Sequence, residues 1–260
     1  MGKDDYVAAH LLGNEGPVGI PELSVEVTLN SGDSVIVPVL FSDRAQDMDD
    51  GTSMVGVILT HGAGGDMESP HMRMYVSEIT KNGLPVVHFS CKSPSLEYRS
   101  RVYEKVLKAL TSWPATKHIQ SWVLAGHSMG SRVAIEVAHK FETSQDSSFP
   151  RVLGCVLFSW PVHAQNNPSE LRDQGNLCKV NLPILMVQGT RDEWSQEDHF
   201  QDLVSRISTP KLKVYRVEGA EHHMCPHKRI SNKEERERTE ANILAALREA
   251  GLFIKDLSIM

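Results

Sequence analysis

Five residues from Gly126 to Gly130 place a serine between two glycines, where a strand pattern gives way to a helix pattern. The apolar run Trp122–Ala125 before them is typical of a short buried strand, and Arg132–Lys140 after them has apolar residues at helical spacing. A strand that turns at once into a helix forces its corner residue into a strained backbone conformation. Flanking glycines lack the Cβ atoms that would collide in so tight a turn. The sequence therefore predicts a sharp corner that exposes the hydroxyl of Ser128.

Strand and helix patterns alternate through most of the chain. A β-hairpin is predicted over Ser24–Leu40, with its turn at Asn30–Asp33. Val55–Thr60 is a continuous apolar run of the type found in strands that are covered on both faces. A hairpin followed by repeated strand–helix units predicts an α/β fold with a mostly parallel central sheet and helices on both faces. The later strands are predicted at Leu84–Phe89, Trp122–Ala125, Val152–Trp160, Pro183–Gln188 and Leu212–Val217, and the helices at Pro70–Asn82, Tyr98–Trp113, Arg132–Lys140, Phe200–Ser205 and Glu234–Ala250, the last ended by Gly251.

One domain is expected to hold almost the whole chain, because 260 residues suit a single α/β domain. Residues 1–20 have no clear period and are expected to form a flexible leader, which places the domain at residues 21–255. The polar stretch Ser42–Ser53 is expected to be a surface loop. Val162–Leu177 is too polar for a large lid and too short for a separate cap. No large cap domain is therefore expected.

The composition argues against several classes of function. A formal net charge of -6 disfavours nucleic-acid binding, which needs clustered Lys and Arg. No apolar run is long enough to span a membrane, and the charged amino terminus lacks the pattern of a secretory signal. Tyr6 stands where a myristoylation motif needs Ser or Thr. The four scattered cysteines are expected to be reduced thiols of an intracellular protein, cytoplasmic or alternatively nuclear, and no feature predicts its oligomeric state.

Two later residues are candidates for the groups that would activate Ser128. A serine hydroxyl is a poor nucleophile until a base takes its proton, and an acid must orient that base. In hydrolases with a serine at such a corner, the acid and then the base follow in the chain, each at the carboxyl end of a later strand. Asp192 follows the strand Pro183–Gln188 through a short turn, and His222 follows Leu212–Val217. We therefore expect Asp192 to be the acid and His222 the base.

Neighbouring residues compete for both roles. Glu193 and Asp198 are alternative acids, and Asp192 is favoured because it comes nearest to the end of the strand. His223 competes with His222, and only one of the two can point into the site. The choice of base is therefore left open.

The glycine-rich segment His61–Gly65 follows the first predicted parallel strand. Acyl transfer needs two backbone donors for the developing oxyanion, one from the residue after the serine and one from this loop. Met129 would supply the first donor, and Ala63 or Gly64 the second. Glycines in the loop let the backbone approach a substrate closely.

Cofactor sites are not expected from these segments. A phosphate loop would continue with Lys and Ser or Thr, and a dinucleotide fingerprint would read Gly-x-Gly-x-x-Gly; neither pattern is present. A zinc site is the less favoured interpretation of the residues after the last strand, because their spacing matches no paired-ligand pattern. These residues are His222, His223, Cys225 and His227.

Four segments together carry a family resemblance: Thr60–Met67, Phe89–Lys92, Gly126–Arg132 and Gly219–His222. With them the chain resembles the dienelactone-hydrolase-related α/β-hydrolases. Within that group it is similar to the testis-expressed hydrolase-like subfamily and to the hydrolase-like domain of a nonspecific-lethal chromatin complex subunit. The similarity runs from about Val55 to Ala250, which is most of the chain.

The resemblance implies an α/β-hydrolase fold with a catalytic triad of Ser128, Asp192 and His222. Dienelactone hydrolases proper use a cysteine nucleophile, so Ser128 argues against lactone substrates. His223 stands where relatives tend to have Ser. The resulting hypothesis is a serine hydrolase that cleaves an ester, thioester or related acyl bond of a small molecule through an acyl-enzyme, without metal or cofactor. The alternative is a non-catalytic scaffold for protein–protein interaction, as in the chromatin subunit domain.

Overall fold

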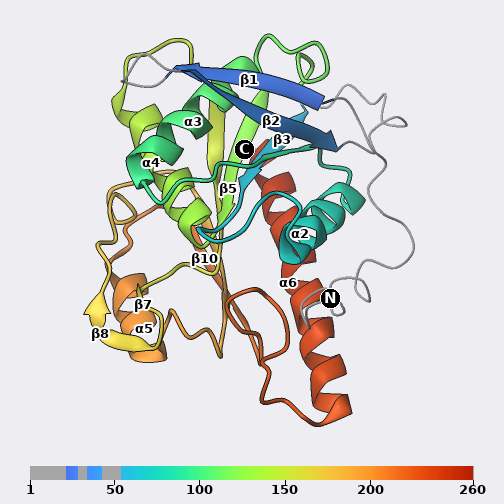
Figure 1. Cartoon of the computed structure of the whole chain (residues 1–260), viewed down its shortest axis with the longest axis vertical. Coiled ribbons are helices and arrows are strands. Elements are labelled where there is room, and N and C mark those ends of the chain that lie inside the picture. The colour runs from blue at the N-terminus through green and yellow to red at the C-terminus, as the bar shows by residue number, and fades with distance from the viewer. Residues whose placement is uncertain (1–21, 29–33, 43–53, 260) are drawn as a thin grey trace.

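A computed structural model describes residues 22–28, 34–42 and 54–259, and an eight-stranded sheet forms its centre (Figure 1). The strand order across the sheet is β1-β2-β4-β3-β5-β6-β9-β10. β2 pairs antiparallel with β1 and β4, and the pairs from β4 to β10 are parallel, as predicted. The strands are β1 (Glu22–Thr28), β2 (Ser34–Ser42), β3 (Val55–Thr60), β4 (Val86–Phe89), β5 (Ser121–His127), β6 (Arg151–Phe158), β9 (Ile184–Gly189) and β10 (Leu212–Val217).

Helices cover both faces of this sheet (Figure 1). One core layer lies between the sheet and α2 and α6, and the other between the sheet and α3, α4 and α5. In β3, Val57 and Leu59 belong to the first layer and Ile58 to the second, since successive side chains of a strand point to opposite faces. All six residues of β3 are buried, as its continuous apolar run predicts. The helices are α2 (Pro70–Lys81), α3 (Leu96–Ala109), α4 (Met129–Thr143), α5 (Glu197–Arg206) and α6 (Lys233–Ser258).

The predicted amino-terminal hairpin is confirmed. β1 and β2 pair in continuous register, from Glu22 opposite Leu40 to Thr28 opposite Ser34. The predicted leader at residues 1–20 and the hairpin turn at residues 30–33 lie outside the described residues. So does the predicted surface loop, except for Ser42, which ends β2 instead.

The prediction that Gly251 ends the last helix is wrong. α6 continues through this position to Ser258. A Cβ atom on Gly251 would lie 2.6 Å from Cγ of Asn82, the residue that caps the end of α2. The glycine therefore permits close packing of α6 against α2, and no left-handed turn stops the helix there.

The polar stretch after β6 forms a small antiparallel hairpin. β7 (His163–Ala164) pairs with β8 (Asn167–Leu171), and most of β8 is exposed. In the ranges that the structure describes, this hairpin is the nearest thing to a cap, and no large cap domain is present. This hairpin brings side chains to the carboxyl ends of the parallel strands of the central sheet, where the candidate site lies.

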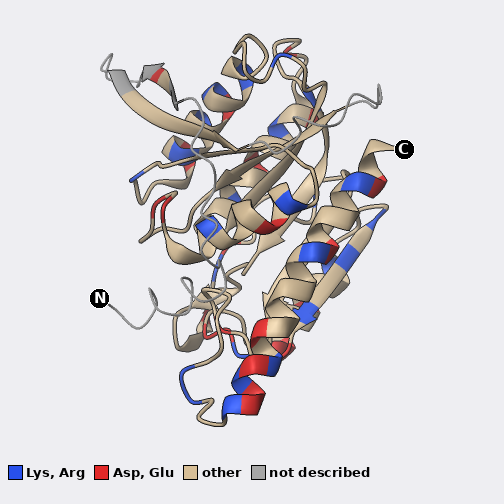
Figure 2. Ribbon diagram, turned by 90° about the vertical axis from the view of Figure 1, so that its right-hand side faces the viewer, with Lys and Arg blue, Asp and Glu red and all other residues tan. Residues whose placement is uncertain are grey.

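The long helix α6 has a charged outer side and an apolar inner side. Figure 2 shows positions of basic and acidic residues mixed along it, and Lys233 and Glu237 form an ion pair in its first turns. Ile243, Leu247 and Ile254 are buried against the sheet. None of the helices in the described part of the chain has both the length and the apolar character that a membrane crossing requires.

Candidate active site

Ser128 lies at a sharp corner between β5 and α4, as the sequence predicts. Its backbone angles, φ 54° and ψ -115°, belong to a region that L residues rarely adopt. A Cβ atom on Gly126 would lie 2.1 Å from the carbonyl carbon of Gly130, and one on Gly130 would lie 2.3 Å from the carbonyl oxygen of Thr60. Ser131 fastens the corner from inside, because its hydroxyl donates to the carbonyl oxygen of Gly126 at 2.6 Å. The two glycines and this hydrogen bond allow the strained turn.

The fold brings Ser128, His222 and Asp192 into one hydrogen-bonded row. Nε2 of His222 lies 2.8 Å from Oγ of Ser128, and Nδ1 lies 2.9 Å from each carboxylate oxygen of Asp192. A carboxylate oxygen can only accept, so Nδ1 carries the hydrogen and Nε2 is free to accept the serine proton. All three residues are buried, Ser128 with 9% of its surface exposed, so the predicted exposure of its hydroxyl is limited to the cavity that it lines. The row has the geometry in which a base can take a proton from a nucleophile.

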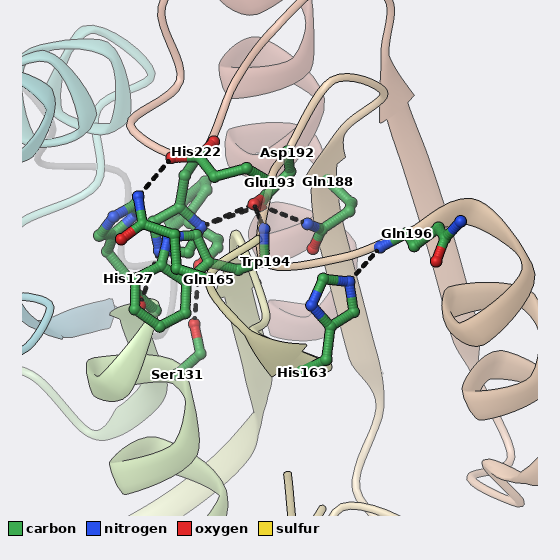
Figure 3. A network of polar contacts seen from close by, with 12 residues as sticks. His127, Ser131, His163, Gln165, Gln188, Asp192, Glu193, Trp194, Gln196 and His222 are labelled. Atoms are coloured by element: carbon green, nitrogen blue, oxygen red, sulfur yellow. Dashed lines mark hydrogen bonds and ion pairs between the residues drawn. The ribbon is translucent and has the colours of Figure 1, made fainter. Parts of the chain in front are cut away.

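Asp192 is held by two further donors from its own segment (Figure 3). The side-chain amide of Gln188 donates to Oδ2 at 2.6 Å, and the backbone N–H of Trp194 donates to Oδ1 at 2.8 Å. The Trp194 ring stacks on the imidazole of His222, with ring centres 5.2 Å apart. Sequence reasoning missed Gln188, although a polar residue at the end of an otherwise apolar buried strand is a usable signal.

The competing residues lie elsewhere. His223 is exposed, and its ring centre lies 5.2 Å from that of His71 at the rim of the site. Glu193 accepts a hydrogen bond from the side chain of Gln165, and Asp198 is exposed in the first turn of α5. The hydrogen bonds therefore join Asp192 and His222, and not these neighbours, into one row with Ser128.

Two of the residues considered as zinc ligands, Cys225 and His227, make local contacts in the loop after β10. The thiol of Cys225 donates to the carboxylate of Glu221 at 3.2 Å, and Nδ1 of His227 accepts from the backbone N–H of Arg229. Within the described residues, no group of three or more His, Cys, Asp or Glu side chains is arranged to hold a metal ion.

The glycine-rich loop after β3 and the start of α4 face the same cavity. Ala63, Gly64 and Met129 all line it, beside Ser128. Met129 is the first residue of α4, where backbone N–H groups have no acceptor inside the helix. Backbone donors at such a place can stabilise negative charge that develops on a bound group.

Arg99 anchors this loop, and the sequence analysis did not single it out. It lies on α3 with only 1% of its surface exposed, and its guanidinium donates to the carbonyl oxygen of His61. Nε2 of His61 in turn accepts from the backbone N–H of Cys91 at 2.9 Å. The first residue of the loop is thus fixed from two sides, which holds the following amides in place.

Four imidazoles cluster in the wall of the cavity that Ser128 also lines, namely those of His71, His127, His222 and His223, with neighbouring ring centres 4.3 to 5.8 Å apart. Nδ1 of His127 lies 3.2 Å from the hydroxyl of Tyr75 in the core. Burial and the neighbouring imidazoles hold the pKa of His127 well below its usual range and lower the pKa of His71 to about 3. Both rings are therefore uncharged near neutral pH, so they add no positive charge beside His222.

The buried histidines predict a loss of stability in mild acid. Burial lowers the pKa of His88 to about 4 from 6.5, and the pKa of His127 is also depressed. Below pH 6.5 the unfolded chain therefore binds protons that the folded chain cannot, and the free energy of unfolding falls as the pH falls, by on the order of 1 kcal/mol per pH unit for each such histidine. Urea denaturation between pH 7 and pH 4 measures this loss.

A pair of histidine variants tests whether burial of His127 causes this pH dependence of stability. His127→Gln is expected to flatten the dependence of unfolding free energy on pH, and substitution of the exposed His118 by Gln is the matched control. A curve for His127→Gln as steep as that of the wild type would contradict the assignment.

The hydroxyl of Ser128 borders a cavity of about 660 Å³. Much of its wall is apolar, with two arginines, Arg132 and Arg172, as its cationic groups. Trp160 is not part of the wall, because it is buried in the core and its indole N–H donates to Gln174. The apolar part of the wall includes Met74, Pro94, Pro161, Trp194 and Met224.

The mostly parallel eight-stranded sheet, its helical layers and the strand–corner–helix at Ser128 are those of the α/β-hydrolase fold. The chain belongs to the alpha/beta hydrolase domain family, which it matches over residues 53–250.

Solved structures share this fold at low sequence identity. Est1E from Butyrivibrio proteoclasticus is 12% identical with a TM-score of 0.65, over 92% of this chain and all of its own. A bacterial heroin esterase is 15% identical with a TM-score of 0.64, over 95% of this chain and 89% of its own. Dienelactone hydrolase from Anabaena variabilis is 17% identical with a TM-score of 0.60, over 91% of this chain and 97% of its own. Likeness at these identities concerns the fold alone.

Proposed function

We propose that this protein is a serine hydrolase that cleaves an ester, thioester or related acyl bond of a small molecule. The observation that carries the proposal is the row from Ser128 through His222 to Asp192, with 2.8 Å and 2.9 Å between the interacting atoms. The row borders a cavity of about 660 Å³, a size suited to a small substrate. Two proteins with similar folds are named as an esterase and a dienelactone hydrolase, and both names describe cleavage of an acyl bond.

The geometry of the row supports the first half of the proposed reaction. Oγ of Ser128 attacks the acyl carbon while Nε2 of His222 takes its proton, and Asp192 stabilises the imidazolium that forms. The acyl oxygen becomes an oxyanion, which accepts hydrogen bonds from the backbone N–H of Met129 and from that of Ala63 or Gly64.

The second half releases the products. His222 returns its proton to the leaving alcohol or thiol, and the acyl group stays on Ser128. Water then attacks the acyl-enzyme with His222 again as the base, which frees the acid and restores the serine. These steps use only protein groups and water.

Labelling with a fluorophosphonate probe tests the proposal, together with p-nitrophenyl esters of increasing acyl chain length. We expect labelling, turnover and a chain-length preference set by the depth of the cavity. Absence of both labelling and turnover would contradict a hydrolase, and a stable partner that co-purifies with such an inert protein would favour the scaffold function.

A matched pair of histidine variants tests the choice of base. Replacing His222 by Gln is expected to lower kcat by about 10⁴-fold, because its imidazole is the group that links Ser128 to Asp192 among the described residues. Replacing His223 by Gln is expected to lower it by less than about tenfold, since this exposed ring packs against His222 but takes no part in the hydrogen bonds of the row. Steady-state kinetics with p-nitrophenyl acetate measures both values, and a larger loss in His223→Gln would reverse the assignment.

A further inference from the structure

Two arginine side chains border the cavity close to Ser128. The backbone N–H of Arg132 donates to the carbonyl oxygen of Ser128, so Arg132 stands one helical turn from the corner. The guanidinium of Arg172 lies 5.0 Å from the ring centre of Trp194, and that ring stacks on His222. The two cationic groups therefore belong to the surroundings of the reacting atoms.

Neither arginine forms an ion pair with a carboxylate in the part of the chain that the structure describes. Nη2 of Arg132 donates to the backbone carbonyl of Asp173 at 3.0 Å, and Nε of Arg172 donates to that of His163 at 3.1 Å. A guanidinium has five N–H donors, so each arginine keeps donors that these bonds do not use. Burial, and after it the nearby charge of Arg172, lower the pKa of Arg132, while the carboxylates of Asp173 and Glu136 act in the opposite direction.

The acidic groups near this pair are engaged elsewhere. The carboxylate of Glu136 accepts from the backbone and side-chain amides of Asn176, at 3.3 Å and 2.7 Å. The carboxylate of Asp173 accepts from the backbone N–H of Gly175 at 2.9 Å. No ion pair joins these carboxylates to either guanidinium in the described residues, so the arginine pair keeps N–H donors for a group that enters the cavity.

The second arginine is held in place by the hairpin after β6. The backbone N–H of Arg172 donates to the carbonyl oxygen of Val162 at 2.9 Å. The side chain of Gln174 donates to the same carbonyl and accepts from the buried indole of Trp160. A position fixed by these bonds suits recognition, because little ordering is needed when a ligand binds.

We propose that the substrate is an ester that also carries a carboxylate, which Arg132 and Arg172 bind at one side of the cavity. This inference rests on the proposed hydrolase function and names its substrate class. The planar guanidinium matches a carboxylate with two parallel hydrogen bonds. The ligand charge would also relieve the repulsion between the arginines. The apolar wall of the cavity then holds the rest of the substrate.

Matched ester pairs test the proposal. The first pair is mono-p-nitrophenyl adipate, which has a free carboxylate, and methyl p-nitrophenyl adipate, in which that carboxylate is a methyl ester. The two have the same leaving group and differ in one charge. The second pair, p-acetoxybenzoate and its methyl ester, moves the carboxylate to the alcohol side. We expect the anionic member of at least one pair to have the higher kcat/KM, by about tenfold or more. Preference for the neutral member in both pairs would overturn the proposal.

Arginine variants test whether Arg132 and Arg172 cause the preference for the anionic ester. Arg132→Met and Arg172→Met are each expected to remove it, while Arg206→Met, at an exposed position of α5, is the matched control that retains it. An anionic preference that survives both cavity substitutions would overturn the assignment to these residues. Arg132→Lys and Arg172→Lys keep the positive charge but lose the two parallel hydrogen bonds of a guanidinium. They replace a methionine variant that does not fold.

Binding without turnover separates this inference from the proposed function. Calorimetry on Ser128→Ala compares monomethyl adipate with dimethyl adipate, and we expect the monoanion to bind about tenfold more tightly or better. Equal binding would overturn the carboxylate site even if the enzyme hydrolyses neutral esters. Tighter binding of the monoanion by a wild-type protein that neither turns over esters nor takes the probe would refute the hydrolase and uphold the site.

Discussion

Replacing Ser128 by Ala is expected to abolish labelling by a fluorophosphonate probe and to lower ester turnover by about 10⁴-fold or more. The physical reason is that the hydroxyl of Ser128 is the one that His222 and Asp192 are placed to activate in the part of the chain that the structure describes. Residual turnover would come from the loop amides and from substrate binding alone. Gel-based labelling and kcat with p-nitrophenyl acetate measure the two effects.

A control variant makes this result specific. Ser205→Ala removes an exposed serine on α5, away from the cavity, and should keep both labelling and turnover. Equal melting temperatures for the wild type and Ser128→Ala would show that the loss is chemical. Probe labelling that persists in Ser128→Ala would refute Ser128 as the nucleophile.

Replacing Gly126 by Ala is expected to destabilise the protein by at least about 4 kcal/mol, a large part of the stability of an ordinary domain. The new Cβ would lie 2.1 Å and 2.2 Å from the carbonyl carbon and oxygen of Gly130. These are backbone atoms at the start of α4, so no side-chain rotation can relieve the clash. Thermal denaturation followed by circular dichroism, with the yield of folded protein, measures the loss.

Gly64→Ala is the matched control for this prediction. A Cβ atom at Gly64 would meet nothing within 4 Å, so stability should change by no more than about 0.5 kcal/mol. A Gly126→Ala protein that melts within a degree or two of the wild type would mean that the corner can relax. That result would remove the steric argument for the glycine.

The layered α/β fold could be predicted from the sequence because it depends on local patterns. The buried run Val55–Thr60 and the Gly126–Gly130 corner each depend on residues near one another in the chain, so their structure can be inferred locally. Gly251 shows the limit of such reasoning. Its role depends on Asn82, a residue of another helix that sequence spacing cannot place beside it.

The candidate site also has a part that the sequence could predict and a part that it could not. Chain order and strand ends determined that Ser128, Asp192 and His222 were the residues to consider, because the carboxyl ends of parallel strands meet at one edge. The sequence could not choose between His222 and His223, since adjacent side chains of a loop have no fixed direction. Only tertiary packing put His222 between the other two and turned His223 toward the rim.

Tertiary structure alone also decided the surroundings of the row. Arg99 reaches the carbonyl of His61 from a helix 38 residues away in sequence, and Arg172 arrives on a hairpin that the sequence presents only as a polar stretch. Neither residue belongs to a motif, because each acts through a contact between distant segments. The sequence by itself determined the fold and the chemistry to look for, whereas long-range packing decided which charges and donors surround that chemistry.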